Sequence, residues 1–290
     1  METYTVAKNV CNLYAPGSET EVVSQAILGQ TVHKLAESGD HVHVRTPDGY
    51  TGRVRAHVLV SASAGRRPSL CEKMQVTALF APVLSKPRAK AELITTLVLS
   101  TVLPVAGSAR AYARVLLPNG VTGYVLMHQL AHPVRARKTA TTLQIRNLGK
   151  VAATVGRRLV GTPYLWGGLS TYGIDCSGFT QLCYRLAGID LLRDARMQIA
   201  DKRFQSVADG QEFAQADLQV GDLVFFGEAA TVATAQRITH VGMILPDGRM
   251  IHSAGGFGVV IEERAGHRYA GKYLAARRLK AECRLQLQFA

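Results

Sequence analysis

The pattern of apolar and polar positions divides the chain into a β-rich first part and a second part that begins with helices. In the first 132 residues, short β-branched runs are separated by turn signals, and Asp48-Gly49 and Asn119-Gly120 are typical of tight hairpins. From about residue 141 to 160, apolar residues recur at helical spacing. The apolar stripe predicted for this helix consists of Leu148, Val151, Val155 and Leu159.

The β-rich part contains an internal repeat. Residues 21–54 align with residues 92–125 at one constant offset and without a gap, so that Gly29 aligns with Ser100. Upstream, the words Leu-Tyr-Ala-Pro from Leu13 and Leu-Phe-Ala-Pro from Leu79 also match. Two copies of about 60 residues are too few and too long for a solenoid. The repeat therefore predicts two tandem small all-β domains, each built as an open barrel.

The predicted domain boundaries follow changes in composition. Residues 61–69 and 132–139 are small, polar or basic and are typical of linkers. We therefore expect a first barrel over residues 1–62, a second barrel over residues 70–132 and a third domain over residues 140–290.

A cysteine opens a predicted helix near the middle of the chain. A loop rich in glycine and aromatic residues, 161–168, leads into Asp175-Cys176-Ser177-Gly178, and helical apolar spacing continues to a stop signal at Gly188. The first turn of a helix presents unpaired N–H groups and the positive end of the helix dipole. We therefore expect the pKa of Cys176 to fall from about 8.5 to roughly 3.5–7.5.

Two histidines lie downstream on a predicted β-hairpin. His240 falls in the strand-like run 238–245 and His252 in the returning run 250–253, with Asp247-Gly248 at the turn. The imidazoles are expected to be near neighbours, so His252 can fix the tautomer of His240. A cysteine, a histidine base and an orienting polar group are the parts of a nucleophilic site. Helices followed by antiparallel strands predict an α+β domain.

Other interpretations of these residues remain open. A single histidine on a strand is more often a satisfied polar residue, and a single cysteine on a helix is more often a small core residue. Cys176, His240 and His252 could also bind zinc, but their spacing has no paired-ligand signature. The conjunction of all three motifs favours catalysis, and neither a metal nor another cofactor is expected.

Composition and charge limit which binding partners and which cellular compartment we expect for the protein. The net charge is +13, yet the basic residues are scattered, which disfavours nucleic-acid binding and leaves attraction to an anionic substrate or polymer open. Five cysteines without paired spacing favour a reducing compartment. No secretory signal and no membrane-spanning run is seen, so we expect a cytoplasmic monomer, or a secreted or periplasmic one if a leader has been removed.

The β-rich repeats resemble a known class of domain. Leu-Tyr-Ala-Pro from Leu13, Val-Ser-Gln-Ala-Ile-Leu-Gly from Val23 and Pro-Asp-Gly-Tyr-Thr-Gly from Pro47 are similar to the bacterial SH3-like domains of cell-wall enzymes. One departure is that Arg53 and Tyr124 stand where a tryptophan is usual.

The second part resembles the NlpC-type cell-wall cysteine peptidases. The motifs are Gly-Thr-Pro-Tyr-Leu-Trp-Gly-Gly from Gly161, Asp-Cys-Ser-Gly-Phe from Asp175, Gly-Asp-Leu-Val-Phe-Phe from Gly221, Thr-His-Val-Gly-Met from Thr239 and Ile-His-Ser from Ile251. The resemblance covers roughly residues 140–280 and implies a papain-like fold. It also implies that Cys176 is the nucleophile, His240 the general base and His252 the third catalytic residue. Tyr164 would line the oxyanion hole together with the Cys176 backbone N–H.

The resemblance further implies substrate-binding residues beside the nucleophile. Asp175 and Ser177 match residues that contact the substrate, and Asp194, followed by Ala195, matches an acid that binds the free amine of an N-terminal L-Ala. From spacing alone, Asp175 and Asp194 could equally be helix caps.

Two residues of the first repeat extend the resemblance. Tyr50 matches a tyrosine that the first SH3-like domain offers to the active site, and its counterpart in the second repeat is Val121. A hairpin-edge aromatic is the alternative interpretation of Tyr50. Gln25 stands where some relatives place a glutamate that also holds the amine.

The combination of domains resembles the γ-D-glutamyl-L-diamino-acid endopeptidases of cell-wall recycling. The expected substrate is a short murein peptide such as L-Ala-γ-D-Glu-diamino acid. The alternatives are an amidase or acyltransferase on the same scaffold, or a cell-wall-binding protein without activity.

Overall fold

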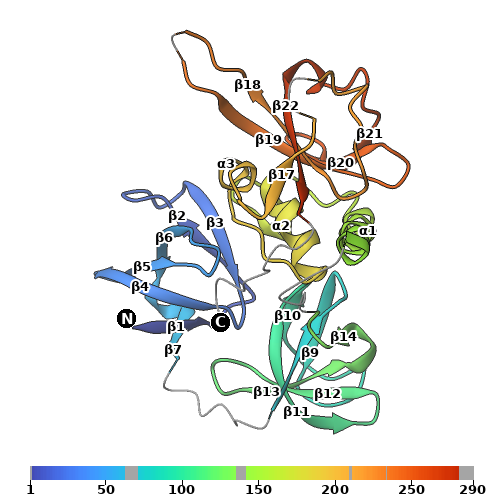
Figure 1. Cartoon of the computed structure of the whole chain (residues 1–290). Helices are drawn as coiled ribbons and strands as arrows, with labels where there is room; N and C mark the ends of the chain where they lie inside the picture. Colours follow the sequence, from blue (N-terminus) through green and yellow to red (C-terminus); the bar gives the residue numbers. More distant parts are fainter. Residues whose placement is uncertain (1, 63–70, 135–141, 209–210, 233, 281–290) are drawn as a thin grey trace. The chain divides into compact units, whose positions relative to one another are not determined.

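The computed structural model describes residues 2–62, 71–134, 142–208, 211–232 and 234–280 (Figure 1). The predicted linkers fall largely on residues 63–70 and 135–141, which lie outside these ranges, as does Cys283. The chain forms two compact units, one of Met1–Pro133 with Leu169–Thr171 and one of Val134–Gly168 with Tyr172–Ala290. The boundaries predicted for three domains stay a prediction.

The first half of the first unit is a seven-stranded antiparallel sheet in the order β3-β2-β6-β5-β4-β1-β7. Alternate residues of its strands point into one apolar core around Leu13, Val42, Val44 and Val54, as the period of a half-buried strand requires. A single 3-10 turn, η1 (Ala56–Val58), precedes the last strand. The strands are β1 (Thr3–Val6), β2 (Val10–Tyr14), β3 (Val22–Ile27), β4 (Thr31–Ser38), β5 (His41–Arg45), β6 (Thr51–Arg55) and β7 (Leu59–Ser61).

The second half repeats this topology strand for strand. Its sheet has the order β10-β9-β13-β12-β11-β8-β14, in which every strand occupies the place of its counterpart in the first sheet. This confirms the predicted repeat of two small all-β domains. The elements are β8 (Glu72–Val76), β9 (Phe80–Leu84), β10 (Leu93–Val98), β11 (Val102–Ala109), β12 (Tyr112–Leu116), β13 (Thr122–Leu126), η2 (Met127–Gln129) and β14 (Leu130–Ala131).

The two dipeptides predicted to form hairpin turns do so. Gly49 and Gly120 both have positive φ, at 83° and 84°, a region that glycine enters without a steric penalty. In each turn, a backbone N–H before the dipeptide donates to the carbonyl oxygen of the residue directly after it, from Thr46 N to Tyr50 O and from Leu117 N to Val121 O.

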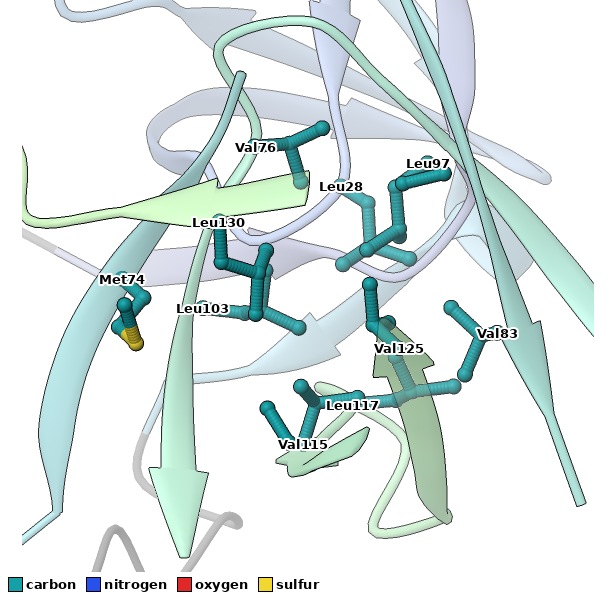
Figure 2. Close-up of a cluster of buried hydrophobic side chains, with 12 residues drawn as sticks. Leu28, Met74, Val76, Val83, Leu97, Leu103, Val115, Leu117, Val125 and Leu130 are labelled. Carbon is teal, nitrogen blue, oxygen red and sulfur yellow. The ribbon is translucent and has the colours of Figure 1, made fainter. Parts of the chain in front are cut away.

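The two barrels share part of their apolar core. Leu28, which follows β3 of the first barrel, is buried among side chains of the second barrel, and Figure 2 shows it beside Leu97 and Val125. The backbone packs equally closely there, because a Cβ on Gly29 would lie 2.7 Å from the carbonyl oxygen of Val102. The remaining buried members of this cluster are Met74, Val76, Ala81, Val83, Leu103, Ala113, Val115, Leu117 and Leu130.

The second unit is α+β, as predicted. Helices come first, and α2 packs against α1 and against two strands of a six-stranded antiparallel sheet in the order β17-β22-β18-β19-β20-β21. The helices are α1 (Thr142–Arg158), α2 (Cys176–Leu186), α3 (Ala195–Ile199) and η3 (Ala270–Lys272). The strands are β16 (Gly173–Ile174), β17 (Phe204–Ser206), β18 (Leu223–Glu228), β19 (Arg237–Ile244), β20 (Met250–Ala254), β21 (Gly258–Glu262) and β22 (Tyr273–Leu279); β15 (Leu169–Ser170) belongs to the first unit.

The apolar face of α1 differs from the predicted stripe. Val155 and Leu159 are buried, but Val151 is 44% exposed, while Ala152 and Ala153 are fully covered. The contact is made through small residues, because a Cβ at Gly156 would already lie 3.1 Å from the ring of Phe179. Alanine and glycine contribute little to a hydrophobic pattern. The predicted stripe therefore included Val151 and left out Ala152 and Ala153, which are both buried. Within the described ranges, no helix has both the length and the apolar character needed to cross a membrane.

Candidate active site

Residues 175–178 form the start of a helix, and three of them, Asp175, Ser177 and Gly178, hold its geometry. Asp175 is the N-cap of α2, and its Oδ1 accepts a hydrogen bond of 2.7 Å from Gly178 N. Ser177 donates to the same oxygen at 3.1 Å. Any Cβ at position 178 would collide with the carbonyl oxygen of Gly168, so only glycine lets the helix approach the preceding loop. Cys176 is thereby fixed as the first residue of α2.

A buried arginine holds this helix start. Arg193 forms a two-pronged ion pair with Asp175, at 3.0 Å from Nη1 to Oδ1 and 2.6 Å from Nη2 to Oδ2. It also donates to the Gly168 carbonyl oxygen at 3.2 Å and to Ser177 Oγ at 3.1 Å. The predicted cap role of Asp175 is therefore confirmed, and the carboxylate joins the loop before Cys176 to the helix after it.

The prediction of a lowered pKa for Cys176 is wrong. Burial, together with the nearby Asp175 carboxylate, raises the pKa of the thiol to about 12. Backbone N–H groups of Val241 and Ser177 contact the sulfur and lower its pKa, but by less. Desolvation penalises the charged form more strongly here than the helix end favours it. The contact with Val241 also places the thiol beside β19, because Val241 directly follows His240 on that strand.

The two histidines of the hairpin are hydrogen-bonded, as predicted. His240 Nε2 lies 2.7 Å from His252 Nδ1, and both rings are buried. The other face of His240 stacks on the ring of Tyr269, with centroids 4.1 Å apart and planes 7° from parallel. Burial lowers the pKa of His240 well below 6.5 and, opposed by Glu262, lowers that of His252 to about 4. Both rings are therefore neutral at pH 7.

Tyr164 lies in the loop before α2, where it forms a single parallel bridge with Ile174. Its pKa is raised first by burial and then by the Cys176 side chain. A tyrosine with a raised pKa keeps its proton at neutral pH, so its hydroxyl is a hydrogen-bond donor. A hydroxyl that keeps its proton can serve as a donor in an oxyanion hole.

The residues predicted to bind substrate have structural partners of their own. Asp194 is the N-cap of α3, with Oδ1 accepting from Arg196 N at 2.9 Å, and Ala195 is the buried first residue of that helix. In the first unit, Gln25 Oε1 accepts from Leu169 N at 2.8 Å. Tyr50 is half-buried at the end of the β5–β6 turn. These contacts confirm the cap expected of Asp194; the substrate contacts of Asp175, Ser177, Asp194, Ala195, Tyr50 and Gln25 stay predictions.

Three residues of the site carry no sequence motif. Arg193 reaches Asp175 from beyond α2, Tyr269 covers His240, and Glu262 Oε2 lies 2.9 Å from His252 Nε2. The position of Glu262 could have been suspected only from its place on the strand that follows the His252 strand. In the part of the chain that the structure describes, no group of three or more His, Cys, Asp or Glu residues is arranged to hold a metal ion.

Comparisons with known proteins give consistent matches. A family model described as the NlpC/P60 family matches residues 161–278. The dipeptidyl-peptidase 6 of Lysinibacillus sphaericus is 31% identical over 228 residues, which is 75% of this chain and 79% of that protein. The γ-D-glutamyl-L-lysine dipeptidyl-peptidase of Bacillus cereus is 29% identical over 79% of this chain, which spans 66% of that protein's length.

A solved structure supports the fold along almost the whole chain. The crystal structure of an NlpC/P60 family protein from Bacillus cereus superposes with a TM-score of 0.77. The match covers 96% of this chain and 99% of the other, at 24% sequence identity. The fold class predicted from the sequence, two small all-β domains followed by an α+β domain, is confirmed.

Proposed function

The chain belongs to the NlpC/P60 family of cysteine peptidases, and on this basis we propose that it hydrolyses the γ-D-glutamyl-L-diamino-acid bond of murein peptides. One observation carries the proposal: a buried thiol at the start of α2 lies against β19, whose His240 is hydrogen-bonded to His252. The names of two relatives support the substrate class, since both are called dipeptidyl-peptidases and one name contains γ-D-glutamyl-L-lysine.

In the acylation step, Cys176 Sγ attacks the γ-carbonyl carbon of D-Glu while its proton passes to His240. Because the resting thiol and the imidazole are both neutral, this transfer accompanies the attack instead of preceding it. The carbonyl oxygen becomes an oxyanion, for which the Tyr164 hydroxyl and the Cys176 N–H are the donors.

The tetrahedral intermediate then collapses with cleavage of the C–N bond. His240 returns its proton to the leaving amine of the diamino acid, which leaves a thioester on Cys176. The same imidazole, neutral again, removes a proton from water, and the resulting hydroxide attacks the thioester. The second tetrahedral intermediate collapses with cleavage of the C–S bond, and the proton held by His240 returns to the Cys176 sulfur. The products are the γ-carboxyl peptide and the free thiol.

The proposed substrate is a short peptide with a free N-terminal amine, and the proposed setting is a monomer in the cytoplasm. Asp194 is the acid proposed to pair with the amine, and about a quarter of its side chain is exposed. Gln25 carries no charge, and both ends of its amide are in use, with Nε2 donating to Asn12 at 3.0 Å. Asp194 also has a partner, since its Oδ2 lies 3.3 Å from Arg196 Nη2, but its carboxylate carries the charge that Gln25 lacks. We therefore assign the amine contact to Asp194 in preference to Gln25.

Mass spectrometry of two matched peptides tests the proposal. L-Ala-γ-D-Glu-diaminopimelate is expected to be cut at the γ-glutamyl bond, whereas its N-acetylated twin is expected to be cut far more slowly. Cys176→Ala is expected to cut neither. Equal cleavage of both peptides would overturn the free-amine requirement, and no cleavage of either would overturn the proposed substrate. Replacing diaminopimelate by lysine then identifies the preferred diamino acid.

A further inference from the structure

The hydrogen-bonded chain at the active site does not end at His252. We propose that Glu262 is a positioning residue that fixes the tautomers of His252 and His240 and so leaves His240 Nδ1 free to accept the thiol proton. This inference deepens the proposed function and rests on it, because it concerns the same nucleophile and base.

The geometry comes from the pairing of two neighbouring strands. In the register between β20 and β21, Met250 lies opposite Glu262 and His252 opposite Val260. His252 and Glu262 are thus diagonal neighbours, within reach of long side chains. The two hydrogen bonds are 2.7 Å long, from His240 Nε2 to His252 Nδ1, and 2.9 Å long, from His252 Nε2 to Glu262 Oε2.

The direction of these hydrogen bonds follows from the chemistry of their ends. An ionised carboxylate only accepts, so the proton between His252 and Glu262 belongs to His252 Nε2. A neutral imidazole carries a single N–H, which leaves His252 Nδ1 as an acceptor. The proton between the two rings then belongs to His240 Nε2, and His240 Nδ1 carries none. This is the tautomer that a base for Cys176 requires.

The Glu262 carboxylate is itself held from the opposite side. Arg268 Nη2 lies 3.3 Å from Oε1, so the two oxygens have different partners and the carboxylate cannot rotate freely. The Arg268 guanidinium in turn lies over the Phe257 ring, with its Cζ 3.6 Å from the ring centroid. Two further titratable groups lie near this carboxylate: His267, with Nδ1 at 3.9 Å from Oε2, and Tyr269, whose pKa the carboxylate helps to raise.

The Glu262 carboxylate also stabilises the positive charge that forms when His240 is protonated. When His240 takes the thiol proton, its positive charge lies one imidazole away from Glu262, at a buried position where charges are weakly screened. Glu262 therefore favours both the correct neutral tautomer and the imidazolium that follows it. In the serine-protease triad, the corresponding loss of a carboxylate disturbs the tautomer and costs about 10⁴-fold.

The test compares Glu262→Gln with Glu262→Asp and with Glu263→Gln. Glu263 is the exposed neighbour in sequence, so its substitution makes the same charge change without touching His252. Three measurements are made on the full chain: kcat and KM for L-Ala-γ-D-Glu-diaminopimelate, the ¹⁵N chemical shifts of the histidine rings, and the rate at which iodoacetamide alkylates Cys176. Peptide mapping separates alkylation of Cys176 from that of the other thiols.

We expect Glu262→Gln to lower kcat by about a hundredfold, less than in the triad because one more ring separates the acid from the base, with little change in KM. The ring spectra should move from Nε2–H toward Nδ1–H forms, and alkylation should slow. Glu262→Asp should restore part of each effect, and Glu263→Gln should match the wild type. Unchanged tautomers and an unchanged alkylation rate in a folded Glu262→Gln protein would overturn the inference.

The design separates this inference from the proposed function. Tautomers and alkylation do not depend on the choice of peptide, so Glu262 can be tested even if the wild-type protein leaves this murein peptide intact. Conversely, cleavage by the wild type with a kcat that Glu262→Gln leaves unaltered would keep the proposed function and refute the role of Glu262.

Discussion

At the scale of single residues, burial sets the protonation of Cys176, the proposed nucleophile. A helix N-terminus stabilises a nearby negative charge by at most about 2 kcal/mol. Full removal of a charged group from water costs more than that. Burial therefore raises the pKa of Cys176, while it lowers the pKa of His240 and His252. Both trends keep the proton on sulfur until a substrate arrives.

The pH dependence of the reaction follows from these directions. His240, the proposed base, acts only when it is unprotonated. Because its pKa lies well below 6.5, acid should inactivate the enzyme only at a pH well below 6.5. The pKa of the Cys176 thiol is about 12, so the sulfur keeps its proton through the neutral pH range. Cys176 and His240 together then hold one transferable proton. We expect kcat/KM to stay level from about pH 6 to pH 9 and to fall as the pH approaches about 4, the pKa of His252.

The measurement is the pH profile of kcat/KM, with circular dichroism at each pH as the control for folding. An acid limb centred at pH 6.5 or above would contradict the buried neutral histidine inferred here.

At the scale of elements, comparison of the two repeats reveals a strained turn in the second copy. Gly29 and Ser100 occupy the same place after β3 and β10, with φ of 83° and 76°. This region costs a residue with a side chain about 1–2 kcal/mol, against about 0.5–1 kcal/mol of extra backbone entropy for glycine. Ser100 is also buried, and its hydroxyl has no hydrogen-bond partner among the described residues.

Ser100→Gly is therefore expected to stabilise the second barrel by about 1 kcal/mol. Hydrogen exchange of the β10 and β11 amides measures the change. The reverse substitution, Gly29→Ser, is the matched comparison and should destabilise the first barrel, because its Cβ would lie 2.7 Å from Val102 O. Lower protection in Ser100→Gly would show that the serine makes a compensating contact.

Elements whose signals lie in the sequence itself could be predicted. The hairpin turns, the Cys176 helix and the His240–His252 pair follow from patterns within about 15 residues. The repeat follows from the alignment of residues 21–54 with residues 92–125. What could not be predicted depends on tertiary contacts. Glu262 reaches His252 only through strand register, and the pKa of Cys176 reflects burial by distant segments.

At the scale of the whole molecule, a three-residue segment in the loop upstream of Cys176 folds with the first unit. Leu169–Thr171 belongs to that unit, where Leu169 N donates to Gln25 and Thr171 Oγ1 donates to the Leu79 carbonyl oxygen at 2.9 Å. Gln25 lies in the first barrel, and Leu79 lies in the second. This short segment is thus bound by both barrels, which requires them to hold a common arrangement within the unit.

Leu28 supplies the apolar part of that arrangement, so the two barrels should unfold as one. It comes from the first barrel but is 2% exposed within the core of the second. Leu28→Ala is expected to cost about 2–5 kcal/mol and to lower amide protection across β8–β14. Leu13→Ala, in the core of the first barrel, should lower protection in the second barrel as well, because the cost is passed on through Leu28.

The double variant separates coupling from simple destabilisation. If Leu28 carries the coupling, Leu13→Ala should no longer affect the β8–β14 amides once Leu28 is already alanine, a non-additivity that a double-mutant cycle measures. Two barrels that respond independently in every background would contradict the shared core. In that case the backbone approach of Gly29 to Val102 would be a contact between separately folding domains, with no thermodynamic link between them.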